Sequence, residues 1–418
     1  MKTATKKNFS KTYYILLTYY LSFLIFAFII DTPSNIFKGM KNIILEPDIL
    51  ITDYIAIGGI GATFVNSALL SIIIICILIF IGIKPNGSTL AALLTTTGFG
   101  FFGKNILNVW PIFFGVWLYS KYQKEPFFNY ILIAIFGTTL SPTVVQFKSY
   151  GVFTNLFALS CGIIISISMG FILPPIASYC MKLHQGYNLY NTGLAAGLLS
   201  TVLMSILRAV GINFPSRLFW SKGNNNLFLG LLLFMFLSMI ILGYFLDKKA
   251  FKKLPMLFKE SGVLISDFYI VYGSGVTFIN MGILGIVYTC YILIIGGDLN
   301  GPTLGGLFTV VGFGGFGKHI KNTLPIVIGT ALCSLLNIWP INSPSMILAA
   351  LFSTTLAPIS GHFGWIFGLI SGFLHVCIAM NVAYLHGGLN LYNNGFAGGI
   401  VAMFLVPLII EFRKDVLS

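Results

Sequence analysis

The residues best suited to bind a solute lie in a glycine-rich segment that occurs twice, 214 residues apart. Residues 95–104 read Thr-Thr-Thr-Gly-Phe-Gly-Phe-Phe-Gly-Lys, and residues 309–318 read Thr-Val-Val-Gly-Phe-Gly-Gly-Phe-Gly-Lys. Each glycine in a helix costs about 1 kcal/mol relative to alanine, so these segments are expected to depart from regular helix. Backbone groups and hydroxyls exposed by such a break would bind an ion or a polar solute without a buried charge. The candidate ligands are Thr95, Gly98, Phe99 and Gly100, with Thr309, Gly312, Phe313 and Gly314 in the second copy.

Two other interpretations of these segments are open. Small residues let membrane helices approach closely, so the glycines could serve packing alone. Residues 309–314 also resemble the Thr-Val-Gly-Tyr-Gly carbonyl filter of potassium channels, with one extra residue before the first glycine. Such a filter requires four copies, so a potassium-type cation channel built from this chain would be a homodimer.

Each glycine-rich segment ends in a lysine and is preceded by a lone aspartate at the edge of a long apolar stretch. Lys104 and Lys318 could bind an anion, pair with an aspartate, or extend to a membrane interface. Asp53 and Asp267 could cap the helices that follow them or serve as charged groups that tune the site. Because all four recur in both halves, they belong to the candidate site.

Asn66 and Asn280 occupy matching positions about a dozen residues into long apolar stretches. With Thr63 and Thr277, three residues earlier, each puts an amide and a hydroxyl on one face of a helix. These pairs are candidates either for contact with a polar solute or for hydrogen bonding to a neighbouring helix.

Composition assigns the chain to the membrane proteins. It is 57% hydrophobic and 8% charged, whereas soluble domains average about 25% charged residues. Its net charge of +13 comes mostly from short loops between apolar stretches, which is the positive-inside pattern, so no nucleic-acid partner is expected. The first apolar run, residues 13–30, lacks a following signal-peptide cleavage site and is expected to be a retained span. We expect a multi-pass protein of the inner membrane, embedded in the lipid bilayer, with a cytoplasmic N-terminus.

No motif in the sequence indicates catalysis. Walker loops, HExxH and GxSxG motifs, CxxC pairs and clustered carboxylates are absent from the 418 residues. The six cysteines are scattered through apolar stretches. We therefore expect no enzyme activity, no metal site and no cofactor.

The chain is an internal duplication. Residues 86–111 match residues 300–325 at 15 of 26 positions, and further blocks recur in the same order, including residues 184–197 with an Asn-Leu-Tyr-Asn pattern suited to helix capping. The predicted units are a first membrane repeat, 1–215, and a second, 226–418. Each holds about seven apolar segments, and some are too short for the ~30 Å hydrocarbon core, so they are expected to be re-entrant or broken. An odd number of spans would invert one repeat relative to the other, which predicts an all-α integral membrane protein of two homologous, inverted repeats.

The repeated motifs Gly-Phe-Gly-x-Phe-Gly-Lys and Leu-His-x-Gly-x-Asn-Leu-Tyr-Asn-x-Gly resemble an uncharacterised bacterial membrane family, the domain of unknown function 1576, with two copies per chain. The resemblance covers most of residues 48–411 and implies no substrate. Phe278-x-Asn280 and residues 388–393 are faintly similar to pieces of urea transporters, which are also inverted duplications.

These observations predict a transporter-like protein that moves a small polar solute or ion. The site is expected between the two repeats, where the two glycine-rich segments meet. The alternatives are the potassium-type cation channel and a membrane protein without transport activity.

Overall fold

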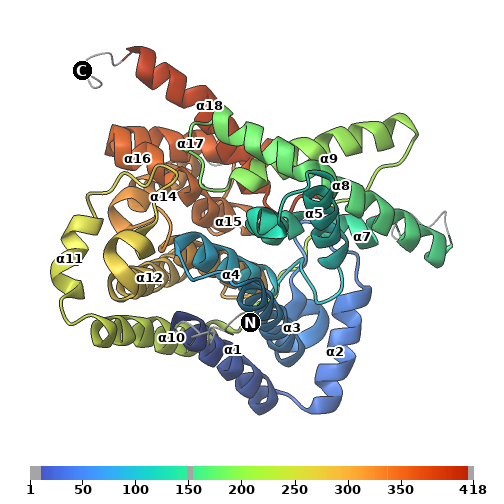
Figure 1. Ribbon diagram of the computed structural model, residues 1–418, viewed down its shortest axis with the longest axis horizontal. Coiled ribbons are helices and arrows are strands. Elements are labelled where there is room, and N and C mark those ends of the chain that lie inside the picture. Colours follow the sequence, from blue (N-terminus) through green and yellow to red (C-terminus); the bar gives the residue numbers. More distant parts are fainter. Residues whose placement is uncertain (1–10, 148–153, 337, 413–418) are drawn as a thin grey trace, which may run out of the picture.

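The computed structural model describes residues 11–147, 154–336 and 338–412, which form helices joined by short loops (Figure 1). Within these ranges there is no β-strand, and two isolated β-bridges join loop residues. The short helix α4 (Gly87–Phe99) lies near the centre of the view in Figure 1. The prediction of an all-α protein is confirmed.

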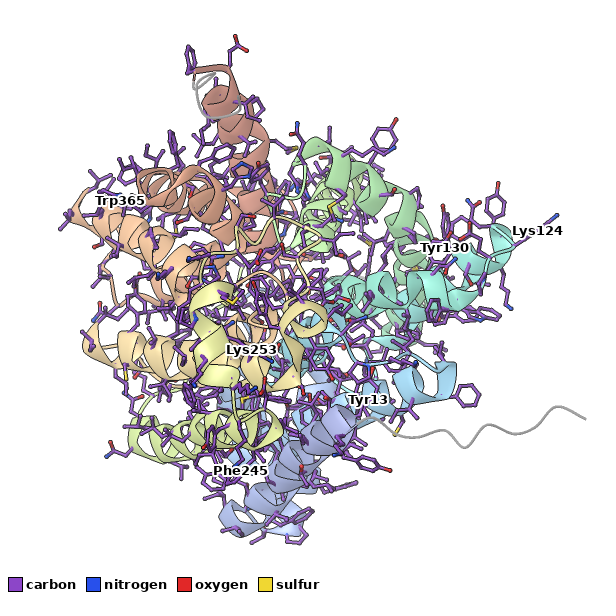
Figure 2. The ribbon with its side chains drawn as sticks, turned by 60° about the vertical axis from the view of Figure 1, so that its left-hand side comes forward. Tyr13, Lys124, Tyr130, Phe245, Lys253 and Trp365 are labelled. Atoms are coloured by element: carbon purple, nitrogen blue, oxygen red, sulfur yellow. The ribbon has the colours of Figure 1, made fainter. Side chains whose placement is uncertain are left out.

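Ten helical segments in the described part of the chain are long and apolar enough to cross a bilayer. They are α1 (Lys11–Ile30), α3 (Tyr54–Ile81), Phe127–Gln146, α8 (Asn155–Leu183), α9 (Asn191–Ala209), α10 (Asn225–Leu246), α12 (Phe268–Ile294), Pro344–Phe363, α17 (Trp365–Val382) and α18 (Asn393–Phe412). Large apolar side chains such as Phe245 and Trp365 lie on the outside of the molecule (Figure 2). An apolar exterior on long helices is typical of a multi-pass membrane protein.

Four of the predicted apolar segments form shorter helices. α4 and α5 (Trp110–Tyr122) have 13 residues each, and their counterparts are α13 (Gly301–Phe313) and α14 (Ile320–Cys333). Thirteen helical residues measure about 20 Å, whereas the hydrocarbon core is about 30 Å thick. As the sequence predicted, these segments are too short to cross a bilayer as straight helices.

The order of the helices repeats along the chain. The helices α1 to α5 recur as α10 to α14, and α8 and α9 recur as α17 and α18. The broken segment between them consists of α6 (Ile131–Gly137) and α7 (Pro142–Gln146) in the first half, and of α15 (Pro344–Ser353) and α16 (Ala357–Phe363) in the second.

Two helices, α2 (Pro33–Leu45) and α11 (Ala250–Leu257), were not predicted. Each has apolar residues on its buried face and lysines on its exposed face, so no continuous apolar run marks it in the sequence. Each packs against the long helix that follows it, α2 against α3 and α11 against α12.

The long helices α3 and α12 each break at one glycine. Gly59 (φ 80°, ψ 171°) and Gly273 (φ 83°, ψ 168°) take a conformation that residues with a side chain rarely adopt. Thr63 and Thr277 donate to the carbonyl oxygens of these glycines, at 2.7 and 3.0 Å. The two hydroxyls that the sequence offered as solute contacts therefore stabilise the helix breaks.

The helices α4 and α13 pack against each other and run antiparallel. Gly87, at the start of α4, lies against Gly315, just past the end of α13, and Gly301, at the start of α13, lies against the end of α4. A Cβ atom on Gly98 would lie 2.6 Å from the carbonyl oxygen of Gly305. Glycine is therefore required for this close approach.

The glycine-rich segments depart from regular helix as predicted, but only in the second half of each segment. Residues 95–99 and 309–313 are regular α-helix, and the chain leaves the helix only at Gly100 and Gly314. Close packing of α4 on α13 offsets the cost that glycine carries in an isolated helix. The irregular backbone begins after the helix and passes through Gly103 (φ 78°) in the first copy.

Candidate solute-binding cavity

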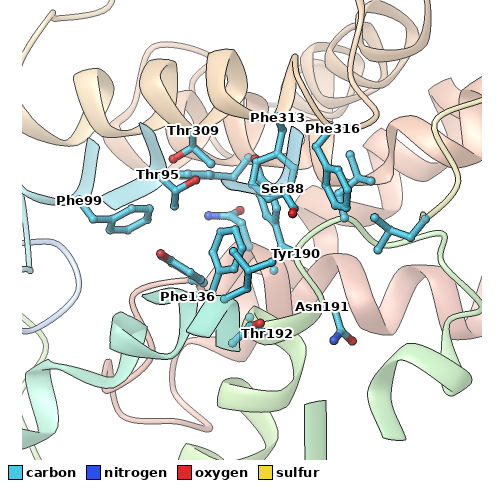
Figure 3. A pocket seen from close by; sticks show the side chains of 18 of the residues that line it. Ser88, Thr95, Phe99, Phe136, Tyr190, Asn191, Thr192, Thr309, Phe313 and Phe316 are labelled. Atoms are coloured by element: carbon cyan, nitrogen blue, oxygen red, sulfur yellow. The ribbon is translucent and has the colours of Figure 1, made fainter. Parts of the chain in front are cut away.

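A cavity of about 150 Å³ lies between the two halves of the chain (Figure 3). Most of its wall comes from matching positions of the two repeats. The matched pairs include Thr95 and Thr309, Phe99 and Phe313, Phe136 and Phe352, Leu189 and Leu391, Tyr190 and Tyr392, and Gly193 and Gly395. Figure 3 shows aromatic rings around the space and the two threonines on one wall. The cavity therefore lies where the repeats meet.

Four of the predicted site residues line this cavity: Thr95, Phe99, Thr309 and Phe313. The predicted glycines do not line it, and each of their carbonyl oxygens accepts a hydrogen bond within the protein. The donors are the Phe101 amide to Gly98, the Gly315 amide to Gly312, Asn66 to Gly100 and Asn280 to Gly314. This geometry favours the packing interpretation of the glycines over backbone ligation.

Asn66 and Asn280 fix the turns that follow α4 and α13. The Asn66 amide donates to the carbonyl oxygens of Gly100 and Lys104, at 2.7 and 2.9 Å. The Asn280 amide makes the two matching hydrogen bonds in the second half, both at 2.8 Å. Both asparagines are fully buried. They hold the lysine-bearing turns in place, which is the second of the two roles that the sequence left open.

Lys104 and Lys318 are fully buried behind the wall of the cavity. The Lys104 ammonium donates to the Tyr392 hydroxyl at 2.6 Å. The Lys318 ammonium donates to the hydroxyls of Tyr190 and Thr354, at 2.5 and 2.7 Å. Each lysine therefore reaches a tyrosine of the opposite half, and both tyrosines line the cavity.

Neither lysine pairs with a carboxylate. Pairing with Asp53 or Asp267 is not observed, and extension to a membrane interface is excluded because both lysines are fully buried. Within the described ranges, the ion pairs closer than 4.0 Å are Arg217–Glu46 and Lys253–Asp247. The same ranges hold no group of three or more His, Cys, Asp or Glu side chains that could bind a metal ion. Two of the three predicted roles of the lysines, pairing with an aspartate and extension to an interface, are therefore not observed.

Asp53 and Asp267 cap helices, as one of their two predicted roles requires. The Asp53 carboxylate accepts from the Ile55 amide at the start of α3, and the Asp267 carboxylate accepts from the Ile270 amide at the start of α12. Asp267 also accepts from the Gly87 amide through both oxygens, at 2.9 and 3.0 Å. It therefore caps α4 of the opposite half as well and joins the two repeats.

The N-termini of α9 and α18 meet at the cavity. The Asn188 amide donates to the Gly395 carbonyl, and the Asn390 amide donates to the Gly193 carbonyl, both at 3.1 Å. A Cβ atom on Gly193 would lie 3.0 Å from the Cα of Gly395. The repeated Asn-Leu-Tyr-Asn pattern thus fixes two helix starts against each other across the repeat boundary.

Five aromatic residues of the cavity wall are absent from the predicted site, and one of them, Phe316, stands within the second glycine-rich segment. Tyr190 and Tyr392 stand inside the repeated Asn-Leu-Tyr-Asn pattern, so their repetition was a usable signal. Phe136 and Phe352 each stand two residues before a repeated Thr-Thr-Leu sequence. Nothing within a single block shows that these rings meet residues of the other half.

The match to a known family covers most of the chain. The family described as "Protein of unknown function (DUF1576)" matches residues 32–209 and 246–411. The chain belongs to this family. The matched regions run from α2 to α9 and from the last residue of α10 into α18, so the prediction of two family domains is confirmed. No curated protein and no solved structure matches the chain, and the similarity to urea transporters stays a prediction.

Proposed function

We propose that this protein is a membrane transporter whose two inverted repeats enclose the path of a small solute. The observation that supports the proposal most is the cavity wall, to which both halves contribute residues from matching positions. Secondary transporters often bind their substrates at the interface of inverted repeats, beside short or broken helices. The short helices α4 and α13 carry Thr95 and Thr309 of this wall.

The antiparallel packing of α4 and α13 supports the inverted arrangement. These helices occupy matching places in the two repeats, yet the start of each lies at the end of the other. Matching helices run in opposite directions when a two-fold axis in the membrane plane relates the repeats.

The matching loops before α3 and α12 differ in exposure, which supports access to the cavity from one side at a time. Leu264 and Ile265 line the cavity, and Ile265 is 85% exposed. The matching residue of the first half, Ile51, is only 8% exposed. The connection between the halves covers it, because the Ile51 amide donates to the Arg217 carbonyl and the Phe219 amide donates to the Ile51 carbonyl. An alternating transporter would exchange such an open and a closed end.

The potassium-type channel has less support. Its filter requires a row of carbonyl oxygens free to bind cations, whereas the glycine-rich segments are helical up to residues 99 and 313. Lys104 and Lys318 would also repel a cation in the cavity. The homodimer that this alternative requires is not needed for the transporter.

We expect the bilayer to be the partner of this protein and the inner membrane to be its location. The expected cytoplasmic N-terminus rests on the positions of basic residues. Residues 1–10, which carry several of them, lie outside the described part of the chain. The proposed function requires no catalysis, no cofactor and no nucleic acid.

Solute flux in proteoliposomes tests the proposal. In a background without the six native cysteines, Thr95→Cys introduces a thiol into the cavity wall. We expect the protein to carry a member of a panel of small anions, neutral molecules including urea, and monovalent cations. A methanethiosulfonate reagent should block that flux through the Thr95→Cys variant.

Phe80→Cys is the matched control, because Phe80 lies on the outer side of α3 and is 82% exposed. Flux through this variant should survive labelling. Two results would overturn the proposal: no flux of any member of the panel, or unchanged flux through fully labelled Thr95→Cys protein.

A further inference from the structure

We infer that the transported solute is a small monovalent anion, an inference that rests on the proposed transport function and names its substrate class. The first observation is the charge around the cavity. None of the described residues that line it is acidic. Two ammonium groups lie behind its aromatic wall, Lys104 at 4.6 Å from the ring centre of Tyr392 and Lys318 at 4.3 Å from that of Tyr190.

These two lysines require compensation for their burial. An ammonium group removed from water loses its hydration, and hydroxyl oxygens and ring faces replace only part of it. A negatively charged solute in the cavity would supply the missing counter-charge, whereas urea or another neutral solute would not. Because one lysine comes from each half, the compensation is available along the whole boundary between the repeats.

The hydroxyl groups of the wall are arranged to donate hydrogen bonds. A tyrosine hydroxyl carries one proton and two lone pairs. In Tyr190 and Tyr392 the oxygen accepts from a lysine, so the phenol proton is available to a bound anion. Thr95 adds a buried hydroxyl that has no hydrogen-bond partner within the protein. Three donors and no charged acceptor favour a negatively charged ligand.

The N-termini of two long helices at the cavity also favour an anion. Thr192 and Gly193 of α9 line the cavity together with Asn394 and Gly395 of α18. The helices have 19 and 20 residues, and each N-terminus carries a partial positive charge. Two such ends that converge on one cavity favour an anion there.

The surface of the cavity favours a monovalent anion. A volume of about 150 Å³ holds a halide or a short carboxylate such as formate or acetate. The mostly apolar wall cannot replace the hydration shell of a divalent anion. The positively polarised edges of aromatic rings suffice for a monovalent one.

Selectivity of flux is the first test. Proteoliposomes that contain the wild-type protein are offered chloride, formate, acetate, urea and potassium in separate experiments. We expect chloride or formate to move at least tenfold faster than urea and potassium. Lys104→Met should lower anion flux somewhat more than tenfold and Lys318→Met somewhat less than tenfold, whereas Lys321→Met, which changes an exposed lysine of α14, should leave it unchanged.

Tyr190→Phe and Tyr392→Phe keep the aromatic rings and remove only the hydroxyls, so they keep the test valid if a lysine variant fails to fold. We expect each to lower anion flux several-fold in protein that still elutes as a single species. Anion flux that is unchanged in the tyrosine variants and in every folded lysine variant would overturn the inference.

Binding in detergent separates the inference from the proposed function. Sodium chloride or sodium formate should raise the Tm of the purified protein relative to sodium gluconate, and Lys104→Met should abolish the rise. Flux of urea or potassium without anion flux overturns the anion inference and leaves transport standing. A rise in Tm without any flux keeps the anion site and overturns transport. Neither a rise nor flux overturns both.

Discussion

The two halves hold their buried lysines differently, although the sequences around them are closely similar. Lys318 donates to two hydroxyls, those of Tyr190 and Thr354, whereas Lys104 donates to that of Tyr392. The protein itself therefore compensates Lys318 better than Lys104. The comparison teaches that a shared pattern of residues does not give the two halves identical contacts, and it predicts that a bound anion would matter more to Lys104.

The aspartates differ in the same way. Asp53 is fully buried and accepts from the amide and hydroxyl of Ser221, at 2.8 and 2.6 Å. Asp267 is partly exposed. Ser221 belongs to the connection between α9 and α10, which covers Ile51 and Asp53. The fold therefore has a closed side near Asp53 and an open side near Asp267.

Substitution of the two lysines should have the largest effect, a loss of anion flux. We expect the double variant Lys104→Met/Lys318→Met to lose about 100-fold of the anion flux, since hydrogen bonds to charged groups contribute about 1.5–3 kcal/mol each. Lys104→Met alone should cost more flux than Lys318→Met. In a Thr354→Val background, Lys318→Met should reduce anion flux as much as Lys104→Met does. Equal losses in both single variants would show that Thr354 contributes nothing to the difference.

The packing of α4 on α13 should give the next largest effect, on stability. Gly98→Ala places a Cβ atom 2.6 Å from a backbone oxygen, so we expect a loss of about 2–3 kcal/mol, seen as a lower Tm in detergent. Gly315→Ala is the control, because its Cβ atom would meet only the tip of Leu90 at 3.2 Å and the matching residue of the first half is already Phe101. A control that loses as much stability as Gly98→Ala would contradict this account of α4 and α13.

The closed and open sides should differ in reactivity. In the background without native cysteines, Ile265→Cys should react with a water-soluble thiol reagent about tenfold faster than Ile51→Cys, since reaction of a covered residue requires local opening. Adding Ser221→Ala, which removes a hydroxyl from Asp53, should speed labelling at Ile51→Cys and leave Ile265→Cys unchanged. Labelling rates that are equal at the two positions would refute the assignment of a closed side.

The aspartates should give the smallest effect. Asp53→Asn should cost about 2 kcal/mol of stability, because a buried carboxylate with donors from two segments is replaced. Asp267→Asn should cost less, about 1 kcal/mol, because the asparagine amide oxygen can still cap α12 and only the contact of the second carboxylate oxygen with the Gly87 amide is lost. Thermal unfolding of the two variants measures the difference, and a larger loss at Asp267 would reverse the comparison.

The fold was largely predictable from the sequence because its signals are local. Apolar runs marked the long helices, the repeated blocks marked the duplication, and the positions of Asp53 and Asp267 marked two helix starts. Helices α2 and α11 were not predicted, because amphipathic segments lack a continuous apolar run. The helical conformation of residues 95–99 was not predicted, because it depends on packing against α13.

The candidate site was less predictable because its contacts cross between the repeats. Thr95, Phe99 and their counterparts were correctly placed at the meeting point of the two segments, and they line the cavity. The glycines were assigned a ligand role, but packing and hydrogen bonds within the protein account for them. The partners of Lys104 and Lys318 lie 288 and 128 residues away, a separation that no local pattern reveals.

The crossed pairs of lysine and tyrosine bear on how such a chain can arise. Each half supplies the tyrosine that the lysine of the other half contacts, so neither half contains a complete site. A shorter ancestor with one repeat would complete the site only by assembling with a second copy in the opposite orientation. Fusion of two genes then removes the requirement that both copies stay identical. The covered side at Ile51 is a difference that a pair of identical subunits could not evolve separately.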